Sequence, residues 1–255
     1  VSSGTTSSPL TITGLTNGTS YSVKIRAING TFNGTASASS SGIPYTTPDA
    51  PAISSITSGN TQLSVTITAP ASNGGSAITS YQYSTNNGST WTTLGSLATS
   101  FTITGLTNGT PYNVRVRAVN AAGSGASSTT TVATPYTTAG APTISSITSG
   151  DSKLTVNFSA PSSNGGSVIT DYLYSIDGGT TWTSVGSTTS PFVITGLTNG
   201  TSYNVKLRAV NAAGNGTASA TTAATPYTTP GAPTGLVVVA GVSQATISFT
   251  APASN

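Results

Sequence analysis

Residues 105–112 read Gly-Leu-Thr-Asn-Gly-Thr-Pro-Tyr, and this stretch recurs almost unchanged on either side of itself. Residues 14–21 and 196–203 both read Gly-Leu-Thr-Asn-Gly-Thr-Ser-Tyr. The three copies are therefore separated by 91 residues each time. Since a unit of this length can form a domain with its own core, the period predicts tandem domains rather than a short-repeat solenoid.

The repeated stretch is predicted to be a turn between two strands. Asn-Gly is a strong turn signal because both residues tolerate positive φ. Phe101 and Ile103 alternate with polar residues before the turn, and residues 112–118 alternate in the same way after it. A period of two indicates strands with one buried face.

The apolar residues that flank each turn form a candidate structural corner. A tyrosine at this position can bury its ring while its hydroxyl hydrogen-bonds to upstream backbone, as in Greek-key sandwiches. The candidate corner residues are Leu15, Tyr21, Leu106, Tyr112, Leu197 and Tyr203.

A longer pattern, G-L-T-N-G-T-x-Y-x-V-x-(V/L)-R-A-V-N-A-A-G, occupies residues 105–123 and 196–214. It resembles the E–F corner and strand F of fibronectin type III domains, and the resemblance covers essentially the whole chain. It implies an all-β fold of tandem Greek-key, immunoglobulin-like β-sandwiches. The family usually carries a tryptophan in strand B, where this chain has Ile67, Phe158 and Phe249. The centre of each core is therefore expected to be aliphatic or built on phenylalanine.

The period divides the chain into two partial and two complete domains. The predicted boundaries are 1–46 for a partial domain with the later strands, 47–137 and 138–228 for complete domains, and 229–255 for a partial domain with the first two strands. In the first partial domain, strand E is expected at Leu10 and Ile12, strand F at 21–27 and strand G at 35–42. We expect other polypeptide to complete both partial domains, either the same chain continued or a neighbouring subunit.

Short proline-rich segments separate the predicted domains, at residues 44–51, 135–142 and 226–233. Such segments act as stiff spacers rather than flexible tethers. The domains are therefore expected to follow one another as beads on a string in a semi-rigid rod.

The composition excludes most catalytic chemistry. The chain has no histidine and no cysteine, the commonest general base and thiol nucleophile. Its acidic residues are Asp49, Asp151, Asp171 and Asp177, and only the last two are close in sequence. Turn formation explains both, and too few carboxylates gather for a hard-cation site. We predict no catalytic residue, no cofactor and no metal site.

The charge distribution also limits the partners. A net charge of +3 over 255 residues is too dilute for a nucleic-acid surface. No apolar run approaches the ~20 residues of a membrane-spanning helix. The expected partners are further repeats or copies of the same protein, and glycans.

Six of the seven basic residues lie on predicted strand F, two in each repeat. This pattern is typical of a solvated strand face, and the sharper hypothesis is a contact row for anionic glycans or a neighbouring filament. Both tryptophans fall early in predicted strand C′. We therefore expect a cation–π contact between a basic side chain of strand F and each tryptophan ring, and the alternative is that a sugar stacks on the same ring. The candidate contact residues are Lys24, Arg26, Trp91, Arg115, Arg117, Trp182, Lys206 and Arg208.

Asn-x-Ser/Thr sequences mark candidate glycosylation sites, although Asn-Gly turns explain several of them. The asparagines are Asn17, Asn29, Asn33, Asn87, Asn108, Asn157, Asn199 and Asn215.

Two functions fit these features. The favoured hypothesis is a non-catalytic spacer, adhesive scaffold or filament-forming repeat region of a long prokaryotic cell-surface or extracellular protein. The alternative is a carbohydrate-binding or linker region of a secreted polysaccharide-degrading enzyme. A catalytic domain elsewhere in the parent protein favours the alternative, and many more repeats favour the first.

Overall fold

The computed structural model describes residues 4–252, and its secondary structure in that range consists of strands and turns. The chain divides into two compact units. One comprises residues 1–58, 62–106 and 110–134, and the other comprises 59–61, 107–109 and 135–255. No helix with the length and apolarity needed to cross a membrane occurs in the described range.

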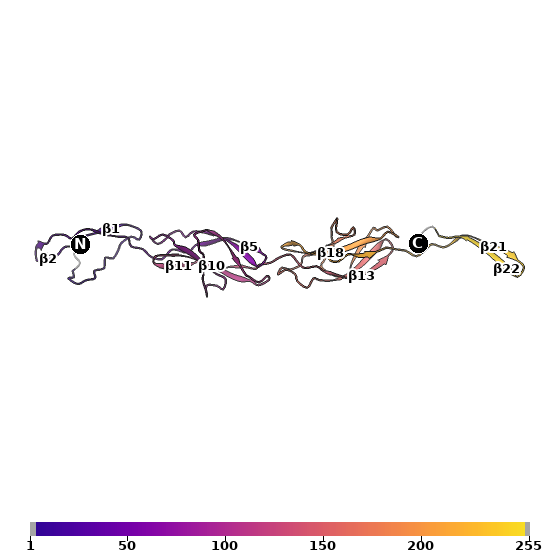
Figure 1. The fold of residues 1–255 in the computed structure, drawn as a ribbon, viewed down its shortest axis with the longest axis horizontal. Helices are drawn as coiled ribbons and strands as arrows, with labels where there is room; N and C mark the ends of the chain where they lie inside the picture. The colour runs from indigo at the N-terminus through magenta and orange to yellow at the C-terminus, as the bar shows by residue number, and fades with distance from the viewer. Residues whose placement is uncertain (1–3, 253–255) are drawn as a thin grey trace. The chain divides into compact units, whose positions relative to one another are not determined.

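The first sandwich has two antiparallel sheets (Figure 1). The smaller sheet has the order β5 (Ala52–Gly59), β6 (Gln62–Thr68), β9 (Ser100–Thr104). The larger has the order β11 (Gly123–Ser127), β10 (Tyr112–Asn120), β7 (Ser80–Ser84), β8 (Thr92–Thr93), and β12 (Thr131–Ala133) also pairs with β10. This order, G–F–C–C′ in the larger sheet, confirms the fold predicted from the repeat.

Alternation along the strands positions the first core. In β6, Leu63, Val65 and Ile67 are buried and the residues between them are exposed. In β10, Val114 and Val116 are fully buried. Burying each such side chain contributes about 1.5–3 kcal/mol. The period-two pattern therefore sets which face of each strand carries polar and basic residues.

The second sandwich repeats this arrangement. Its smaller sheet has the order β13 (Thr143–Gly150), β14 (Lys153–Ser159), β17 (Phe192–Thr195). Its larger sheet has the order β16 (Thr183–Ser184), β15 (Asp171–Ser175), β18 (Tyr203–Asn211), β19 (Gly214–Asn215), with β20 (Thr222–Ala224) on β18.

Phenylalanine occupies the centre of the second core, as expected from Phe158 at the strand-B position where the family usually has tryptophan. The Phe158 ring lies edge-on to Tyr172, with the ring centroids 4.6 Å apart. It also meets Phe192 at 5.9 Å. The first sandwich has buried Ile67 at the equivalent place, so its centre is aliphatic.

The N-terminal segment forms less structure than predicted. β1 (Tyr21–Val23) pairs with β4 (Ser40–Gly42), and β2 (Ile28–Asn29) pairs with β3 (Phe32–Asn33). The prediction of a strand at Leu10 and Ile12 is wrong, because both residues lie outside any strand. In the complete sandwiches the equivalent strands β9 and β17 pair with β6 and β14, and residues 4–46 contain no such partner strand.

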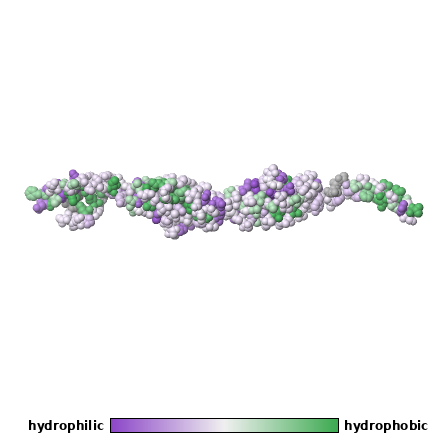
Figure 2. All heavy atoms as spheres, viewed as in Figure 1, coloured by the Kyte–Doolittle hydropathy of each residue, from purple (hydrophilic) through white to green (hydrophobic). Residues whose placement is uncertain are grey.

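The C-terminal segment is a single hairpin of β21 (Thr234–Gly241) and β22 (Gln244–Thr250). Its apolar residues are exposed, including Leu236 at 68% and Phe249 at 59%. Figure 2 shows these hydrophobic atoms as a green surface at the hairpin. No second sheet covers the hairpin among the described residues, so it supplies strands A and B of a sandwich without its core.

Candidate functional site

Each sandwich places one arginine on a tryptophan ring. The guanidinium carbon of Arg117 lies 4.2 Å from the ring centroid of Trp91, and Arg208 lies 4.2 Å from that of Trp182. The tryptophans directly precede β8 and β16, which pair with β7 and β15, and these in turn pair with β10 and β18. The expected cation–π contact is confirmed, and its distance lies within the ~6 Å range of such contacts.

The two arginines differ in their remaining partners. In the first sandwich Arg117 Nε donates a hydrogen bond to Gln82 Oε1 at 2.7 Å. Leu173 occupies the equivalent register position opposite Arg208. Arg208 Nε is buried and has no hydrogen-bond partner among the described residues. The difference between Gln82 and Leu173 therefore leaves the guanidinium donor of Arg208 without an acceptor, whereas that of Arg117 has one.

The second F-strand basic residue of each sandwich lies beside the tryptophan, because a Cβ built on Gly88 would contact both Trp91 and Arg115, and one built on Gly179 would contact both Trp182 and Lys206. Arg115 Nε donates to the carbonyl oxygen of Ser128 at 3.0 Å. Lys24 and Arg26 are exposed on the N-terminal segment, and Lys206 is half-buried on β18. The arginines of the first sandwich are thus both engaged within their own domain, which favours the solvated strand face over a dedicated glycan contact.

The tryptophan rings have limited space for a sugar. Both side chains are half-buried, and an arginine covers one face of each ring. Trp182 Nε1 also donates to the carbonyl oxygen of Gly179 at 3.0 Å, which fixes the ring against the preceding turn. Sugar stacking would need the opposite ring face, since the arginine occupies the first.

Asp177 and Asp171 accept hydrogen bonds from residues of the turns and strands next to them. Asp177 accepts hydrogen bonds from the Ser175 hydroxyl at 2.6 Å and from the hydroxyl and backbone N–H of Thr181 at 2.6 and 3.0 Å. These hydrogen bonds, led by that of Ser175, hold the Asp177 pKa well below its usual value. Asp171 accepts from the Ser184 hydroxyl at 2.6 Å. Within residues 4–252 no three acidic, histidine or cysteine side chains gather as metal ligands.

Two of the three corner tyrosines, Tyr21 and Tyr203, are hydrogen-bonded to upstream backbone. The hydroxyl of Tyr21 accepts from Thr16 N–H at 3.0 Å, and that of Tyr203 accepts from Thr198 N–H at 3.0 Å. Tyr112 is half-buried against the first core. Leu197 is buried, whereas Leu15 and Leu106 are half-buried. In these two repeats the tyrosine hydroxyl therefore joins the turn to the strand that follows it.

The candidate glycosylation sites fall into two groups. At Asn108 the side-chain amide donates to Asn60 Oδ1 at 2.8 Å, and at Asn199 it donates to Asp151 Oδ1 at 2.8 Å. A glycan on that nitrogen would compete with these bonds. Asn157 is half-buried within β14. The remaining asparagines are exposed, namely Asn17, Asn29, Asn33, Asn87 and Asn215.

The first two proline-rich linkers, at residues 44–51 and 135–142, are hydrogen-bonded into the domain that follows them. Thr137 N–H donates to Gly165 O at 2.8 Å. Asn211 Nδ2 donates to Thr137 O at 2.8 Å and to Asn164 O at 2.7 Å. One side chain therefore holds both the linker and the loop at 164–166.

The first unit contains the same set of linker bonds. Thr46 N–H donates to Gly74 O at 2.8 Å, and Asn120 Nδ2 donates to Thr46 O and Asn73 O at 2.7 and 2.8 Å. Sequence analysis did not identify Asn120 and Asn211 as functional residues. The sequence feature that could have identified them is that both are asparagines at the same position of the repeat, at the end of strand F and 91 residues apart.

Tandem antiparallel sandwiches with a G–F–C–C′ sheet and a tyrosine corner define an immunoglobulin-like repeat protein without a catalytic constellation in the described range. The profile of the family described as Fibronectin type III domain matches residues 48–134 and 140–225. The chain belongs to the fibronectin type III family.

Two relatives are glucanases by name. The chain is 40% identical over 174 residues to Exoglucanase B of Cellulomonas fimi, covering 61% of this chain and 15% of that protein. It is 31% identical over 234 residues to Endoglucanase B of Cellulomonas fimi, covering 83% of this chain and 22% of that protein. The chain therefore spans less than a quarter of the length of either relative.

Solved structures include a similar chain, the FN1–FN3 domains of chicken CNTN1. The similarity has a TM-score of 0.41 at 20% sequence identity, and it covers 82% of this chain and 78% of that one.

Proposed function

We propose that this chain is a non-catalytic spacer region of a secreted prokaryotic protein that acts on polysaccharides. The observation that carries the proposal is the hydrogen bonding of the linkers, in which Asn120 and Asn211 each bind linker and loop backbone. A linker with satisfied backbone groups resists bending better than a solvated one, which suits a segment that sets distance.

The relatives support the choice of host protein. Both are named as glucanases, and each matches this chain over a minor part of its length. A spacer between a catalytic domain and a part that binds an insoluble polymer gains from stiffness, because effective concentration at the surface depends on linker length and stiffness.

The test places residues 1–255 between a glucan-hydrolysing domain and a cellulose-binding domain. The matched control replaces them with a Gly/Ser segment of the same number of residues. We expect equal rates on a soluble glucan and a clearly different rate on insoluble cellulose. Equal rates on both substrates, or release of sugar by residues 1–255 alone, would contradict the proposal.

A second candidate is a scaffold of repeats at a cell surface, and the sequence similarity of the two complete repeats favours it. The parent gene separates the two functions. A catalytic domain in the same polypeptide supports the spacer of a polysaccharide-acting protein, whereas a long run of further repeats without one supports the scaffold.

A further inference from the structure

The two complete sandwiches have the same fold but carry different charges. Residues 52–133, from β5 to β12, contain no aspartate or glutamate, and Arg115 and Arg117 are their only basic residues. Two basic residues and no acidic one give this range a formal charge of +2. The equivalent range of the second sandwich, 143–224, contains three acidic and three basic residues, so its charges cancel.

Both charges of the first sandwich lie on the outward face of β10. Arg115 and Arg117 are two residues apart on this strand, so their Cα atoms are about 7 Å apart on the same face. The guanidinium of Arg117 covers Trp91 at 4.2 Å, and a Cβ built on Gly88 would lie 3.4 Å from Trp91 and 3.7 Å from Arg115. The two guanidiniums therefore lie beside the same ring.

Hydrogen bonds orient these two guanidiniums and leave their outer nitrogens available. Arg117 Nε donates to Gln82 Oε1 at 2.7 Å, and Arg115 Nε donates to Ser128 O at 3.0 Å. The Nη groups of the two arginines donate no hydrogen bond to any residue of the described range. Because the planar fork of an arginine matches the oxygens of a carboxylate, this oriented pair can bind carboxylates that approach from solvent.

A carboxylate accompanies the basic residues on the same face of the second sandwich. The register of β15 and β18 pairs Leu173 with Arg208 and places Asp171 two residues from Leu173, on the same face of the sheet. The first sandwich has Ser80 and Gln82 at these two places, since β7 pairs with β10 in the same register. The second sandwich therefore opposes an approaching anion with a charge that the first does not have.

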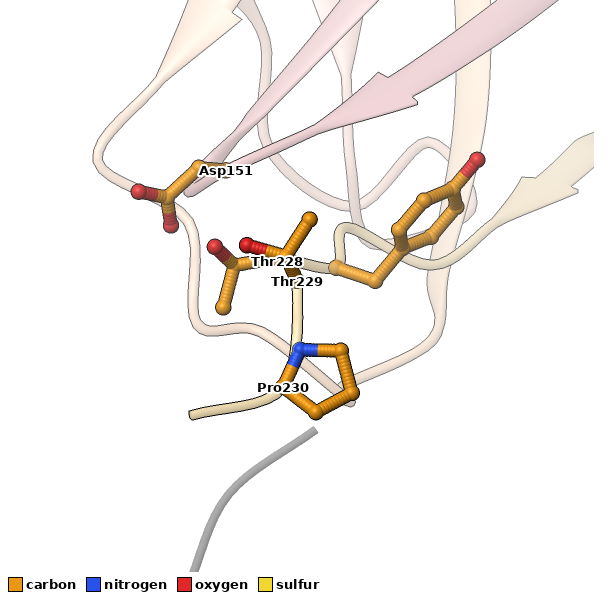
Figure 3. A pocket seen from close by; sticks show the side chains of 5 residues that line it. Asp151, Thr228, Thr229 and Pro230 are labelled. Atoms are coloured by element: carbon orange, nitrogen blue, oxygen red, sulfur yellow. The ribbon is translucent and has the colours of Figure 1, made fainter. Parts of the chain in front are cut away.

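The other two acidic residues of the second sandwich lie on turns. Asp177 occupies the turn after β15, where the first sandwich has neutral Asn86. Asp151 instead follows β13 of the smaller sheet, beside Thr228 and Pro230 of the linker (Figure 3). Two of the three carboxylates thus lie on or next to the strand that pairs with the basic strand β18.

We propose that the outward face of β10 in the first sandwich binds the carboxylate groups of an acidic polysaccharide. The observation that carries the proposal is the pair of oriented guanidiniums in a domain without a carboxylate of its own. This solvated face recognises charge rather than a sugar ring, because Arg117 already covers one face of Trp91. The choice of a polysaccharide among polyanions rests on the function proposed above, a spacer of a protein that acts on polysaccharides.

The two indole N–H signals in an NMR spectrum follow binding, since each sandwich has one tryptophan. On titration of residues 1–255 with a galacturonate oligosaccharide at low salt, we expect a saturable shift of the Trp91 signal and a much smaller one of Trp182. The shift should largely disappear at about 1 M salt, where the Debye length is about 3 Å. Equal shifts of both signals, or an equal effect of a neutral cello-oligosaccharide, would overturn the proposal.

Exchanging residues between the two repeats tests the cause. Ser80→Asp copies Asp171 into the first sandwich and leaves both arginines in place, so we expect the affinity at Trp91 to fall by about threefold or more. Arg115→Gln removes one fork and should weaken binding by about tenfold. Lys153→Gln is the matched control, because it removes a positive charge from the smaller sheet of the other sandwich. Unchanged affinity in both Ser80→Asp and Arg115→Gln, or an equal loss in Lys153→Gln, would refute the proposal.

Poly-glutamate at the same carboxylate concentration separates the possible sources of the carboxylate. Tighter binding of poly-glutamate than of the galacturonate oligosaccharide would assign the face to an acidic polypeptide and refute the choice of polysaccharide. The spacer test fails separately, because it compares rates on neutral glucans. Equal rates there would contradict the spacer even where the Trp91 signal shifts, and a Trp91 signal that does not shift would refute only the binding face.

Discussion

The unsatisfied guanidinium in the second sandwich gives a reciprocal test of the sheet register. Arg117 Nε donates to Gln82 at 2.7 Å, whereas buried Arg208 Nε faces Leu173 and lacks a partner within the described range. The change Leu173→Gln should supply the missing acceptor, and Gln82→Leu should remove the existing one. The two sandwiches serve as controls for each other.

The change in unfolding free energy expected for each variant follows from the hydrogen bond gained or lost and from the apolar contact at residues 82 and 173. A hydrogen bond from a charged donor contributes about 1.5–3 kcal/mol. Losing the half-buried leucine costs about 0.5–1 kcal/mol of apolar contact. Leu173→Gln should therefore stabilise its sandwich by about 1 kcal/mol. Gln82→Leu should destabilise the first sandwich by about 1–2 kcal/mol, because it leaves the part-buried Arg117 Nε without its acceptor.

Hydrogen exchange measures the two effects separately, because the slowest amides of each sandwich report its own unfolding free energy. Leu173→Asn is the control, since its amide is polar but too short to reach Arg208 Nε. We expect Leu173→Asn to destabilise the second sandwich. Equal effects of asparagine and glutamine at position 173, or a stabilising Gln82→Leu, would refute the reasoning.

Three further perturbations act on single contacts. Because its hydrogen bonds lower the pKa of Asp177 below the unfolded value of about 3.9, its stabilising effect is present above that pH and is lost as the pH falls below it. Acid should therefore destabilise the second sandwich more than the first, where neutral Asn86 makes the equivalent bonds, as unfolding at pH 2 and pH 7 would show. Tyr203→Phe should cost its domain about 1 kcal/mol by removing the acceptor of Thr198 N–H, and an unchanged melting temperature would refute the corner's role. Asn211→Ala should cost about 1–3 kcal/mol, because two backbone carbonyls lose their donor, and it should accelerate Thr137 exchange.

Local pattern was sufficient to predict the sandwich. The alternation in residues 112–118 indicates a strand with one buried face, and Val114 and Val116 are indeed fully buried. The sheet order then followed from the family resemblance and predicted the contact between Arg117 and Trp91. Both inferences concern contacts within one repeat.

The contacts that sequence analysis missed join residues far apart in the chain. The missing partner of Arg208 depends on the register between β15 and β18, which no local pattern fixes. The closeness of Gly165 to Thr137 is a backbone contact, and a Gly-Gly pair alone suggests only a turn. The strand expected at Leu10 failed for the same reason, since a strand forms only beside a partner.

The linkers at residues 44–51 and 135–142 are ordered parts of the fold, because their backbone groups are hydrogen-bonded to loops of the following sandwich. Backbone ¹⁵N relaxation at Thr46 and Thr137 tests it most directly, because their N–H groups donate to Gly74 and Gly165. We expect order parameters of about 0.85 at both amides, equal to those of β10 and β18. Values below about 0.6, typical of a flexible segment, would contradict it.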